Sequence, residues 1–384
     1  MNIIKQSGLL LMIAFVVGCD SEVEIEDIST SDFEWNLPKG VYAPRVPESN
    51  PMTTQKVELG RYLFYEKRLS GNQTQSCASC HEQDKAFSDA KALGLGSTGE
   101  HHLRSPQQLT NVGYYTAYTW GNSALTTLED QMNGPLMGDA PVEMGINDEN
   151  RDEVLTRFSS DPFYNRLFEQ AFPKVENPYQ IFYITQAIAS FERTLISYNS
   201  PYDKYTRGDS KAMSASALRG KALFFSEKAE CFHCHSGENF SDSTASEKSF
   251  FINQFFHNTG LYNIGGTGAF PEGNRGIYEL SGKSSDMGKF RASILRNIAV
   301  TAPFMHDGSI ETLREVVDFY AEGGRHTKSG EYAGDGRENP YLSPLIARIS
   351  LSESERNDLV AFLEALSDEE FLTNTKFSNP FKQE

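Results

Sequence analysis

The sequence has almost no cysteine available for disulfide bonds. Only five cysteines occur in 384 residues, and four of them belong to two short motifs, Cys77–His81 (CASCH) and Cys231–His235 (CFHCH). The fifth is Cys19, at the end of an apolar N-terminal run. A scaffold held together by disulfides is therefore excluded, because no cysteine is left to form one.

Basic residues, alternating strand patterns and long apolar runs are also scarce. The 35 Lys and Arg residues are outnumbered by 52 Asp and Glu residues, which gives a formal net charge of −17. Such a charge argues against nucleic acid or an anionic lipid surface as a partner. No apolar run is long enough for a transmembrane helix, and helical spacing predominates over period-two alternation. These features predict an all-α fold with long loops.

The N-terminus predicts export. Residues 1–19 have the positive and apolar regions of a signal peptide, and Val16-Val17-Gly18-Cys19 resembles a lipobox, so we expect lipidation of Cys19. An ordinary signal peptide with an incidental cysteine is the alternative. Residues 20–40 are acidic and predict a tether. We therefore expect a lipoprotein on the periplasmic side of the cell envelope, which contacts the membrane only through its lipid anchor.

The two motifs have the CxxCH spacing of covalent haem c. Cys77 and Cys80, and likewise Cys231 and Cys234, would add to the porphyrin vinyl groups. The histidine that ends each motif, His81 or His235, would ligate the iron on one face. A zinc or dithiol site is the alternative, but each motif offers at most three of the four ligands that zinc needs. We predict two haem c groups.

The two halves of the chain repeat one pattern. In each, a predicted helix leads into CxxCH and is followed by a long Gly-rich loop and closing helices. Breakers at Pro201 and Gly208 place a boundary between the halves. We expect an N-terminal cytochrome c-like domain over 41–200 and a C-terminal one over 201–384. Helical spacing occurs over 50–69, 126–132, 151–172, 178–196, 214–225, 312–321 and 353–366.

The ligand on the second face of each iron is left open by spacing alone. The spare candidates are histidines and methionines, namely His101, His102, His233, His257, His306, His326, Met132, Met137, Met144, Met287 and Met305.

Five segments spread along the chain resemble the bacterial di-haem cytochrome c peroxidase and MauG family. They are LGRYLFYEKRLSGNQTQSCASCH, TLEDQMNGPL with VEMG, SPYDKYTRGD, ALFFSEKAECFHCHSG and FRASILRNIAVTAPFMHDGSIETLREVVDFYAEGG. This resemblance implies two tandem cytochrome c-like haem domains and a peroxide-dependent oxidoreductase.

The resemblance also implies roles for individual residues. Tyr320 stands where MauG has a tyrosine ligand and the peroxidases have a methionine. A phenolate ligand favours Fe(III), whereas a merely packed aromatic is the alternative. At the first haem, the peroxidases' loop histidine aligns near Gly96, and His101 and His102 follow a few residues later. We therefore expect an open iron at His81 that can meet peroxide, and a cap from His101 or His102 is the alternative.

Further matches fall in the predicted distal pocket and between the haems. Gln131, Pro135 and Glu143 match distal-pocket residues, with Glu143 as the acid/base for O–O cleavage. Trp120 matches the tryptophan between the haems, which can relay electrons, and a tryptophan that only packs in the core is the alternative. A calcium ion in the family is bound by carbonyls that match Thr301 and Pro303, but its asparagine falls near Arg104 and Ser105 here.

Several departures, including WGN, HHLRSP and GLYNIGG, resemble a narrower group of MbnH-like di-haem enzymes associated with methanobactin gene clusters. The first hypothesis is that peroxide generates a high-valent di-haem state, which oxidises a tryptophan of an MbnP-like copper-binding partner to kynurenine. The second is peroxide reduction to water with electrons from a small cytochrome c or cupredoxin. The third is a pure electron-transfer cytochrome.

Overall fold

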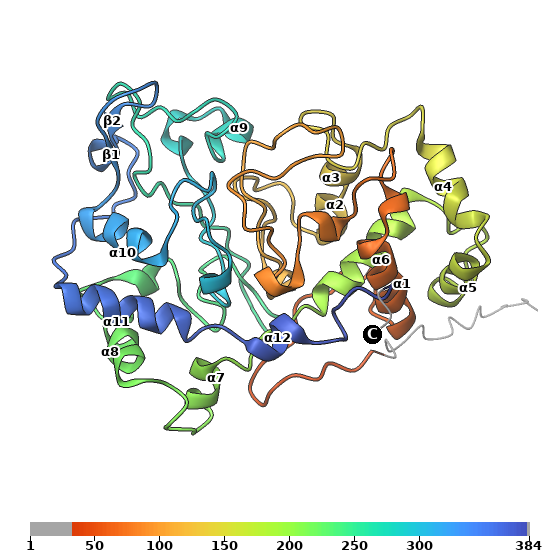
Figure 1. Cartoon of the computed structure of the whole chain (residues 1–384), viewed down its shortest axis with the longest axis horizontal. Coiled ribbons are helices and arrows are strands. Elements are labelled where there is room, and N and C mark those ends of the chain that lie inside the picture. The colour runs from red at the N-terminus through yellow and green to blue at the C-terminus, as the bar shows by residue number, and fades with distance from the viewer. Residues whose placement is uncertain (1–32, 382–384) are drawn as a thin grey trace, which may run out of the picture.

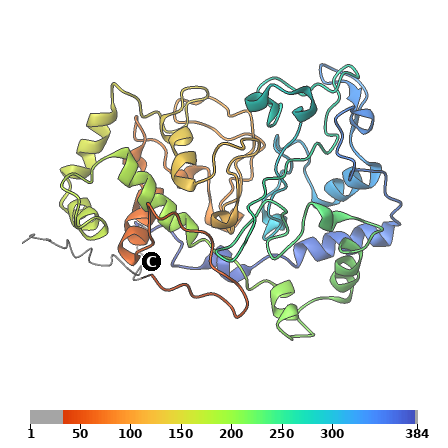
Figure 2. The ribbon, with the colours of Figure 1, turned by 180° about the vertical axis from the view of Figure 1, so that it is seen from behind.

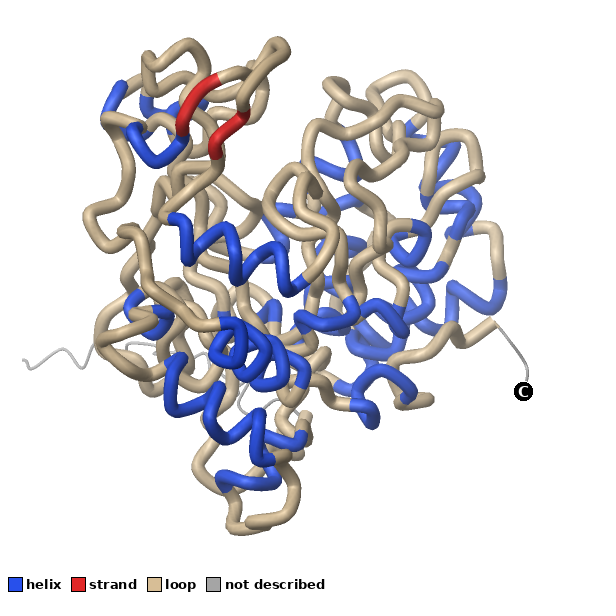
Figure 3. The backbone as a smooth tube through the Cα atoms, turned by 60° about the vertical axis from the view of Figure 1, so that its left-hand side comes forward, coloured by secondary structure: helices blue, strands red, loops and turns tan. Residues whose placement is uncertain are grey.

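A computed structural model describes residues 33–381, and Cys19 lies outside them. Helices joined by long loops make up nearly all of the described chain (Figure 1, Figure 3), and β1 (His326–Thr327) and β2 (Gly334–Asp335) form a short antiparallel sheet. The helices are α1 (Thr54–Tyr65), α2 (Leu128–Gln131), α3 (Asn133–Met137), α4 (Arg151–Ser159), α5 (Pro162–Ala171), α6 (Ile181–Arg193), α7 (Pro201–Thr206), α8 (Ala215–Phe224), α9 (Tyr278–Ser281), α10 (Leu313–Glu322), α11 (Glu353–Glu364) and α12 (Glu369–Thr373). No described helix is both long and apolar enough to span a membrane.

The helices form two groups with separate cores. In the first half α1 packs on α6 and α5, and in the second half α8 packs on α11, which also contacts α10. The two groups lie on opposite sides in Figures 1 and 2. Each group buries its own cluster of apolar side chains. The mostly helical, two-part architecture agrees with the predicted fold class.

Capping residues explain where the principal helices begin. Thr53 accepts a hydrogen bond from the backbone N–H of Lys56 at 3.1 Å and so starts α1. A capping box of Thr312 with Glu315 starts α10. The same motif, in Ser352 and the residue three positions later, starts α11. These side chains satisfy N–H groups that have no partner within the helix.

One expected helical region is divided in two. The spacing over 151–172 is interrupted after Ser159, where α4 ends, and α5 begins at Pro162. The Asp161 carboxylate accepts a hydrogen bond from the N–H of Phe163 at 2.9 Å and caps α5. Proline is favoured in the first helical turn, where its missing N–H costs nothing.

The helix that precedes each CxxCH motif crosses its partner helix in close contact, and a glycine makes this close contact possible. A β-carbon at Gly60 in α1 would overlap the backbone carbonyl oxygen of Ala187 in α6. A β-carbon at Gly220 in α8 would overlap that of Asp358 in α11 in the same way. The two halves therefore use one packing device, as the duplicated pattern in the sequence predicts.

The C-terminal segment returns to the first half. Phe371 of α12 belongs to the first core and lies 5.8 Å from the ring of Phe87. The Tyr65 hydroxyl donates to the carbonyl of Phe377 at 2.7 Å. The C-terminal segment therefore packs against the N-terminal core. The domain boundary near residue 200 remains a proposal.

We expect Gly60→Ala to lower the free energy of unfolding by about 1–3 kcal/mol, because α1 and α6 must separate to admit the methyl group. Gly134→Ala in α3 is the control, since nothing lies within 4 Å of a β-carbon there. Denaturant unfolding of the holoproteins, followed by circular dichroism, measures both changes. Equal stability of the two variants would contradict the proposed crossing.

Candidate functional site

The first CxxCH motif opens into a cavity in the N-terminal half. Cys77 and Cys80 line this first cavity together with His81. Part of its wall comes from the loop over 94–109, and part from α2, α3 and α6. The long loop after the motif therefore forms a wall of the pocket, as its composition predicts.

The second CxxCH motif opens into a cavity of its own. Cys231, Cys234 and His235 line this second cavity, which is more apolar. Residues of α10 and α11 close one side of it, including Tyr320 and Leu359.

A hydrogen bond orients each motif histidine. His81 Nδ1 lies 2.7 Å from the carbonyl oxygen of Phe87, and His235 Nδ1 lies 2.9 Å from that of Phe240. Because a carbonyl can only accept, each Nδ1 carries the proton and each Nε2 keeps a free lone pair. Burial lowers the pKa of both imidazoles and so favours this neutral form.

The two accepting carbonyls belong to residues with unusual backbone conformations. Phe87 has φ 61° and Phe240 has φ 53°, in the left-handed region that bulky side chains rarely adopt. Both rings are fully buried. A residue with a strained backbone occurs at the equivalent place in both halves. This indicates that the hydrogen bond from the motif histidine to its carbonyl has a functional role.

These observations test whether haem c fits the two motifs. All four motif cysteines are free thiols, so their sulfur atoms are available for thioether bonds. Each pair lines a cavity together with an imidazole whose Nε2 is free to bind a metal. The donor set is the one that covalent haem requires, and it repeats in both halves.

The three predicted distal-pocket residues all line the first cavity. They are Gln131 in α2, Pro135 in α3, and Glu143 in the segment that follows α3. The backbone N–H of Met144 donates to the carbonyl of Pro135 at 2.9 Å, which fixes the Glu143 segment beside α3. Loss of hydration raises the pKa of Glu143 to about 7. Although 43% of its side chain is accessible, that carboxyl lines the cavity. It can both accept and donate a proton near neutral pH.

The two loop histidines occupy different places. His102 lines the first cavity, with Nδ1 3.4 Å from the carboxylate of Glu143, whereas His101 is exposed and does not line it. At Gly96 a β-carbon would overlap the carbonyl oxygen of Val142. No side chain fits there without a shift of the backbone, so a histidine at that position is excluded by packing.

Tyr320 and His235 line the same second cavity. Tyr320 shares a face of α10 with Leu313, Val316 and Val317, which line the cavity too. Within residues 33–381 no hydrogen bond is made by its hydroxyl, and burial raises its pKa well above the usual range. The phenol is thus available to a ligand in the cavity.

Trp120 lies between the cavities and lines both. Its indole N–H donates to the carbonyl of Ser105 at 2.8 Å. Its own carbonyl accepts from the backbone N–H of Arg291 at 2.9 Å. The indole ring is therefore held from the first half of the chain, and the backbone of Trp120 is held from the second.

Some residues that were not predicted from the sequence also line the cavities. Arg291 and Tyr115 line both, and the guanidinium carbon lies 3.3 Å from the centre of the tyrosine ring. Glu192 of α6 lines the first, where burial raises its pKa to about 8. Arg291 lies within the segment FRASILRN that carries the resemblance, but only the fold reveals its place between the cavities.

The calcium ion stays a prediction. Thr301 and Pro303 both line the second cavity, but the Arg291 guanidinium lines it too. Arg104 and Ser105 lack the side-chain amide of the family's asparagine, and the carbonyl of Ser105 is engaged by Trp120. A divalent cation prefers carboxylate and carbonyl oxygens to a neighbouring positive charge. These residues fit calcium poorly, and we derive no step through it.

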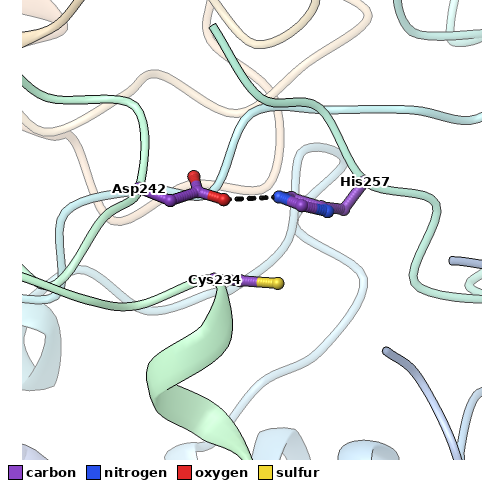
Figure 4. Close-up of side chains that lie close together, drawn as sticks. All are labelled: Cys234, Asp242 and His257. Carbon is purple, nitrogen blue, oxygen red and sulfur yellow. Dashed lines mark hydrogen bonds and ion pairs between the residues drawn. The ribbon is translucent and has the colours of Figure 1, made fainter. Parts of the chain in front are cut away.

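Cys234, Asp242 and His257 form a cluster at the second motif (Figure 4). Their ligand atoms lie within 4.8 Å of one another, and His257 Nε2 lies 2.6 Å from Asp242. Burial is the largest single effect and disfavours the charged imidazole, but the hydrogen bonds and charge interactions with Asp242 and Cys234 together outweigh it and raise the pKa of His257 to about 10. Because the Cys234 sulfur belongs to CxxCH, we do not regard the cluster as a separate metal site.

Other spare ligand candidates at the cavities have packing partners. His306 lines the second cavity and stacks on Phe290 with ring centres 3.7 Å apart. Met132 and Met144 line the first cavity and belong to its apolar core. Met305 lines the second cavity.

Comparison with known proteins agrees with this geometry. Residues 54–211 match the family model described as di-haem cytochrome c peroxidase. Cytochrome-c peroxidase IdrP1 of Denitromonas iodatirespirans is 36% identical, with 84% of each chain covered. The methylamine utilization protein MauG of Methylorubrum extorquens is 35% identical over 84% of this chain and 81% of its own.

The chain belongs to the di-haem cytochrome c peroxidase and MauG family. It is a peroxide-dependent oxidoreductase with two haem c groups. A crystal structure of a MauG-like protein associated with microbial copper homeostasis matches with a TM-score of 0.89. That chain is 46% identical, and the match covers 91% of this chain and all of that one. The family's partners are peroxide and a protein substrate or redox protein.

We expect the rate of reaction with peroxide to fall as the pH is lowered through about 7. Glu143 must be ionised to take a proton from peroxide, and with its pKa at about 7 the carboxylate is lost below that pH. Stopped-flow mixing of the holoprotein with peroxide measures the profile. Glu143→Gln should slow the reaction at least ~100-fold and abolish this fall of the rate at low pH. If the rate of that variant still fell in the same way below about pH 7, Glu143 would be ruled out as the proton acceptor.

Proposed function

We propose that this protein uses hydrogen peroxide to oxidise a tryptophan on a partner protein, with kynurenine as the product. The observation that carries the proposal is Tyr320 at the second cavity, where this chain agrees with MauG rather than with the peroxidases. The copper-homeostasis description of the 46% identical relative supports a copper-binding, MbnP-like partner.

Haem supplies the redox chemistry, since it couples the reduction of peroxide to the oxidation of a donor. In this proposal Cys77, Cys80 and His81 hold the first haem. Cys231, Cys234, His235 and Tyr320 hold the second.

The side chains at the first cavity handle the protons. Glu143 takes a proton from one peroxide oxygen and returns it to the other as the O–O bond breaks. Gln131 and Pro135 shape the pocket in which this occurs. Overall, two peroxides convert tryptophan to N-formylkynurenine and two waters, and hydrolysis then releases formate and leaves kynurenine.

Trp120 connects the two halves of the site. Because it lines both cavities, it offers an aromatic path for electrons between the two cofactors. A partner tryptophan can then lose electrons at the protein surface without entering either cavity. This suits a protein substrate, which is too large to reach a buried cofactor.

We further propose that the protein lies on the periplasmic side of the envelope, anchored by a lipid on Cys19. The lipobox-like Val16–Cys19 segment supports this location, and covalent attachment to CxxCH takes place outside the cytoplasm.

A second function is favoured by the relatives named cytochrome-c peroxidase. In it, peroxide is reduced to water with electrons from a small cytochrome c or cupredoxin. The third candidate function, pure electron transfer, requires both irons to carry two strong ligands. A high-spin signal in the resting spectrum would exclude it.

Mass spectrometry of the partner tests the first function. We expect peroxide and holoprotein to convert one tryptophan of a purified MbnP-like protein to kynurenine, and no conversion when that tryptophan is replaced by phenylalanine. An unmodified partner, together with peroxide-dependent oxidation of reduced cytochrome c, would instead establish the peroxidase function.

A substitution at Tyr320 tests its role. We expect Tyr320→Phe to alter the resting spectrum of the second haem and to lower partner oxidation at least ~10-fold, since the hard phenolate ligand is removed. The reaction of peroxide at the first haem should stay within about twofold of the original protein. Tyr205→Phe is the matched control, because Tyr205 belongs to the same core but does not line the cavity. Identical spectra for all three proteins would exclude ligation by Tyr320.

A further inference from the structure

We propose that Arg291 is the counter-charge for the carboxylates of both haem groups, a fixed positive charge at the place that the two cavities share. In this role Arg291 replaces the calcium ion that the family resemblance implies and that the residues of this chain fit poorly. Only the two haem c groups are required for it, so the role is independent of the proposed oxidation of a partner protein.

Arg291 differs from the other two buried arginines of the described chain. The guanidinium of Arg193 pairs with Glu129 at 2.7 Å, and that of Arg296 pairs with Asp203 at 2.8 Å. Arg291 is only 3% exposed, yet it forms no ion pair with any carboxylate in the described part of the chain. A buried charge without a counter-charge is strongly destabilising. We therefore expect an anion that does not come from the polypeptide to balance it.

Neutral groups hold the guanidinium of Arg291 in place. Nε donates to the carbonyl of Thr119 at 3.2 Å, Nη2 donates to the side-chain oxygen of Gln107, and Nη1 has no partner among the described residues. The guanidinium carbon lies 3.3 Å from the ring centre of Tyr115. The backbone N–H of Arg291 donates to the carbonyl of Trp120 at 2.9 Å. These contacts fix the position of the charge and leave it uncompensated.

The position of Arg291 suits the carboxylates of both cofactors. Arg291 lines the first cavity and the second. Glu143 and Glu192 line the first and Glu230 lines the second, but none of them pairs with Arg291. Each haem carries propionate carboxylates, which are therefore the anions that the cofactors bring to the two cavities. A guanidinium binds a carboxylate through its charge and through its N–H donors.

A second arginine adds positive charge to the first cavity alone. Arg104 lines that cavity and does not line the second. Its Nε donates to the side-chain oxygen of Asn274 at 3.0 Å and its Nη2 to the carbonyl of Gly273 at 2.9 Å, so its partners are neutral too. The calcium-binding asparagine of the family falls near Arg104. Guanidinium groups at these two places would repel a divalent cation.

Redox titration of the holoprotein tests the role of Arg291. The midpoint potential of a haem is raised by a nearby positive charge, because that charge disfavours ferric iron. In Arg291→Gln we expect both equilibria to shift roughly tenfold towards ferric iron, which lowers each potential by about 59 mV. Arg291→Lys keeps the charge, and both equilibria should stay within about threefold of those of the original protein.

Two further variants separate the effect of charge from damage to the fold. Gln107→Glu keeps the shape of the contact and places a carboxylate beside the Arg291 guanidinium, so both potentials should fall with the arginine still present. This variant also tests the role if Arg291→Gln fails to take up haem. Arg104→Gln removes a charge from the first cavity only, and the potential of the first haem alone should fall.

Removal of metal ions and of free anions tests the identity of the two charges. We expect dialysis of the holoprotein against EGTA, and later addition of calcium, to leave both potentials and the resting spectrum unchanged. Both potentials should also be independent of chloride concentration at constant ionic strength, because the counter-charge belongs to the haem.

Four results would overturn the inference. Unmoved potentials in both Arg291→Gln and Gln107→Glu would exclude Arg291 as the counter-charge. A fall of both potentials in Arg104→Gln, as large as that in Arg291→Gln, would show that Arg291 has no special place between the cavities. A response to EGTA would show that calcium is bound, and a response to chloride would assign the charge to a free anion. Partner oxidation is measured in none of these experiments, so its failure leaves the inference intact.

Discussion

The hydrogen bond from each motif histidine to a phenylalanine carbonyl is the constraint on which both sites depend. It fixes the ring tautomer and directs Nε2 of His81 and His235 towards their cavities. To present these carbonyls, Phe87 and Phe240 adopt left-handed backbone conformations, which is unfavourable for large side chains. Burial of both rings in the two cores compensates for that strain. The cores therefore serve the orientation of the ligands as well as stability.

The two halves are joined between the two cavities, where the proposed path for electrons runs. Trp120, Arg291 and Tyr115 line both cavities, and the bonds that hold them cross from one half to the other. The buried side-chain amide of Gln108 donates to the carbonyl of Ile294 at 2.7 Å, and that of Asn297 donates to Thr110 at 3.2 Å. Buried polar contacts of this kind are costly to break, so they hold the two cavities at a constant separation.

The two halves are built on a similar pattern, but their cavities are chemically different. The first cavity is lined by ionisable groups, Glu143, His102 and Glu192, suited to moving protons. The second is lined mainly by apolar residues around Tyr320, suited to holding an iron with a hard ligand and without proton exchange. This asymmetry is what the proposed function requires, with peroxide chemistry in one half and storage of oxidising equivalents in the other.

The sequence by itself determined the cofactor and the architecture, because CxxCH is a local motif and helical periodicity repeats on both sides of it. It also predicted Gln131, Pro135, Glu143 and Trp120 as site residues through resemblance, and the fold brings them to the cavities. Only the tertiary structure distinguished His102 from His101, since the two are neighbours in sequence and their exposure depends on the hairpin that carries them. It alone placed Arg291 and Glu192, because long-range packing, which leaves no local pattern, decides which charged side chains become buried beside a cavity.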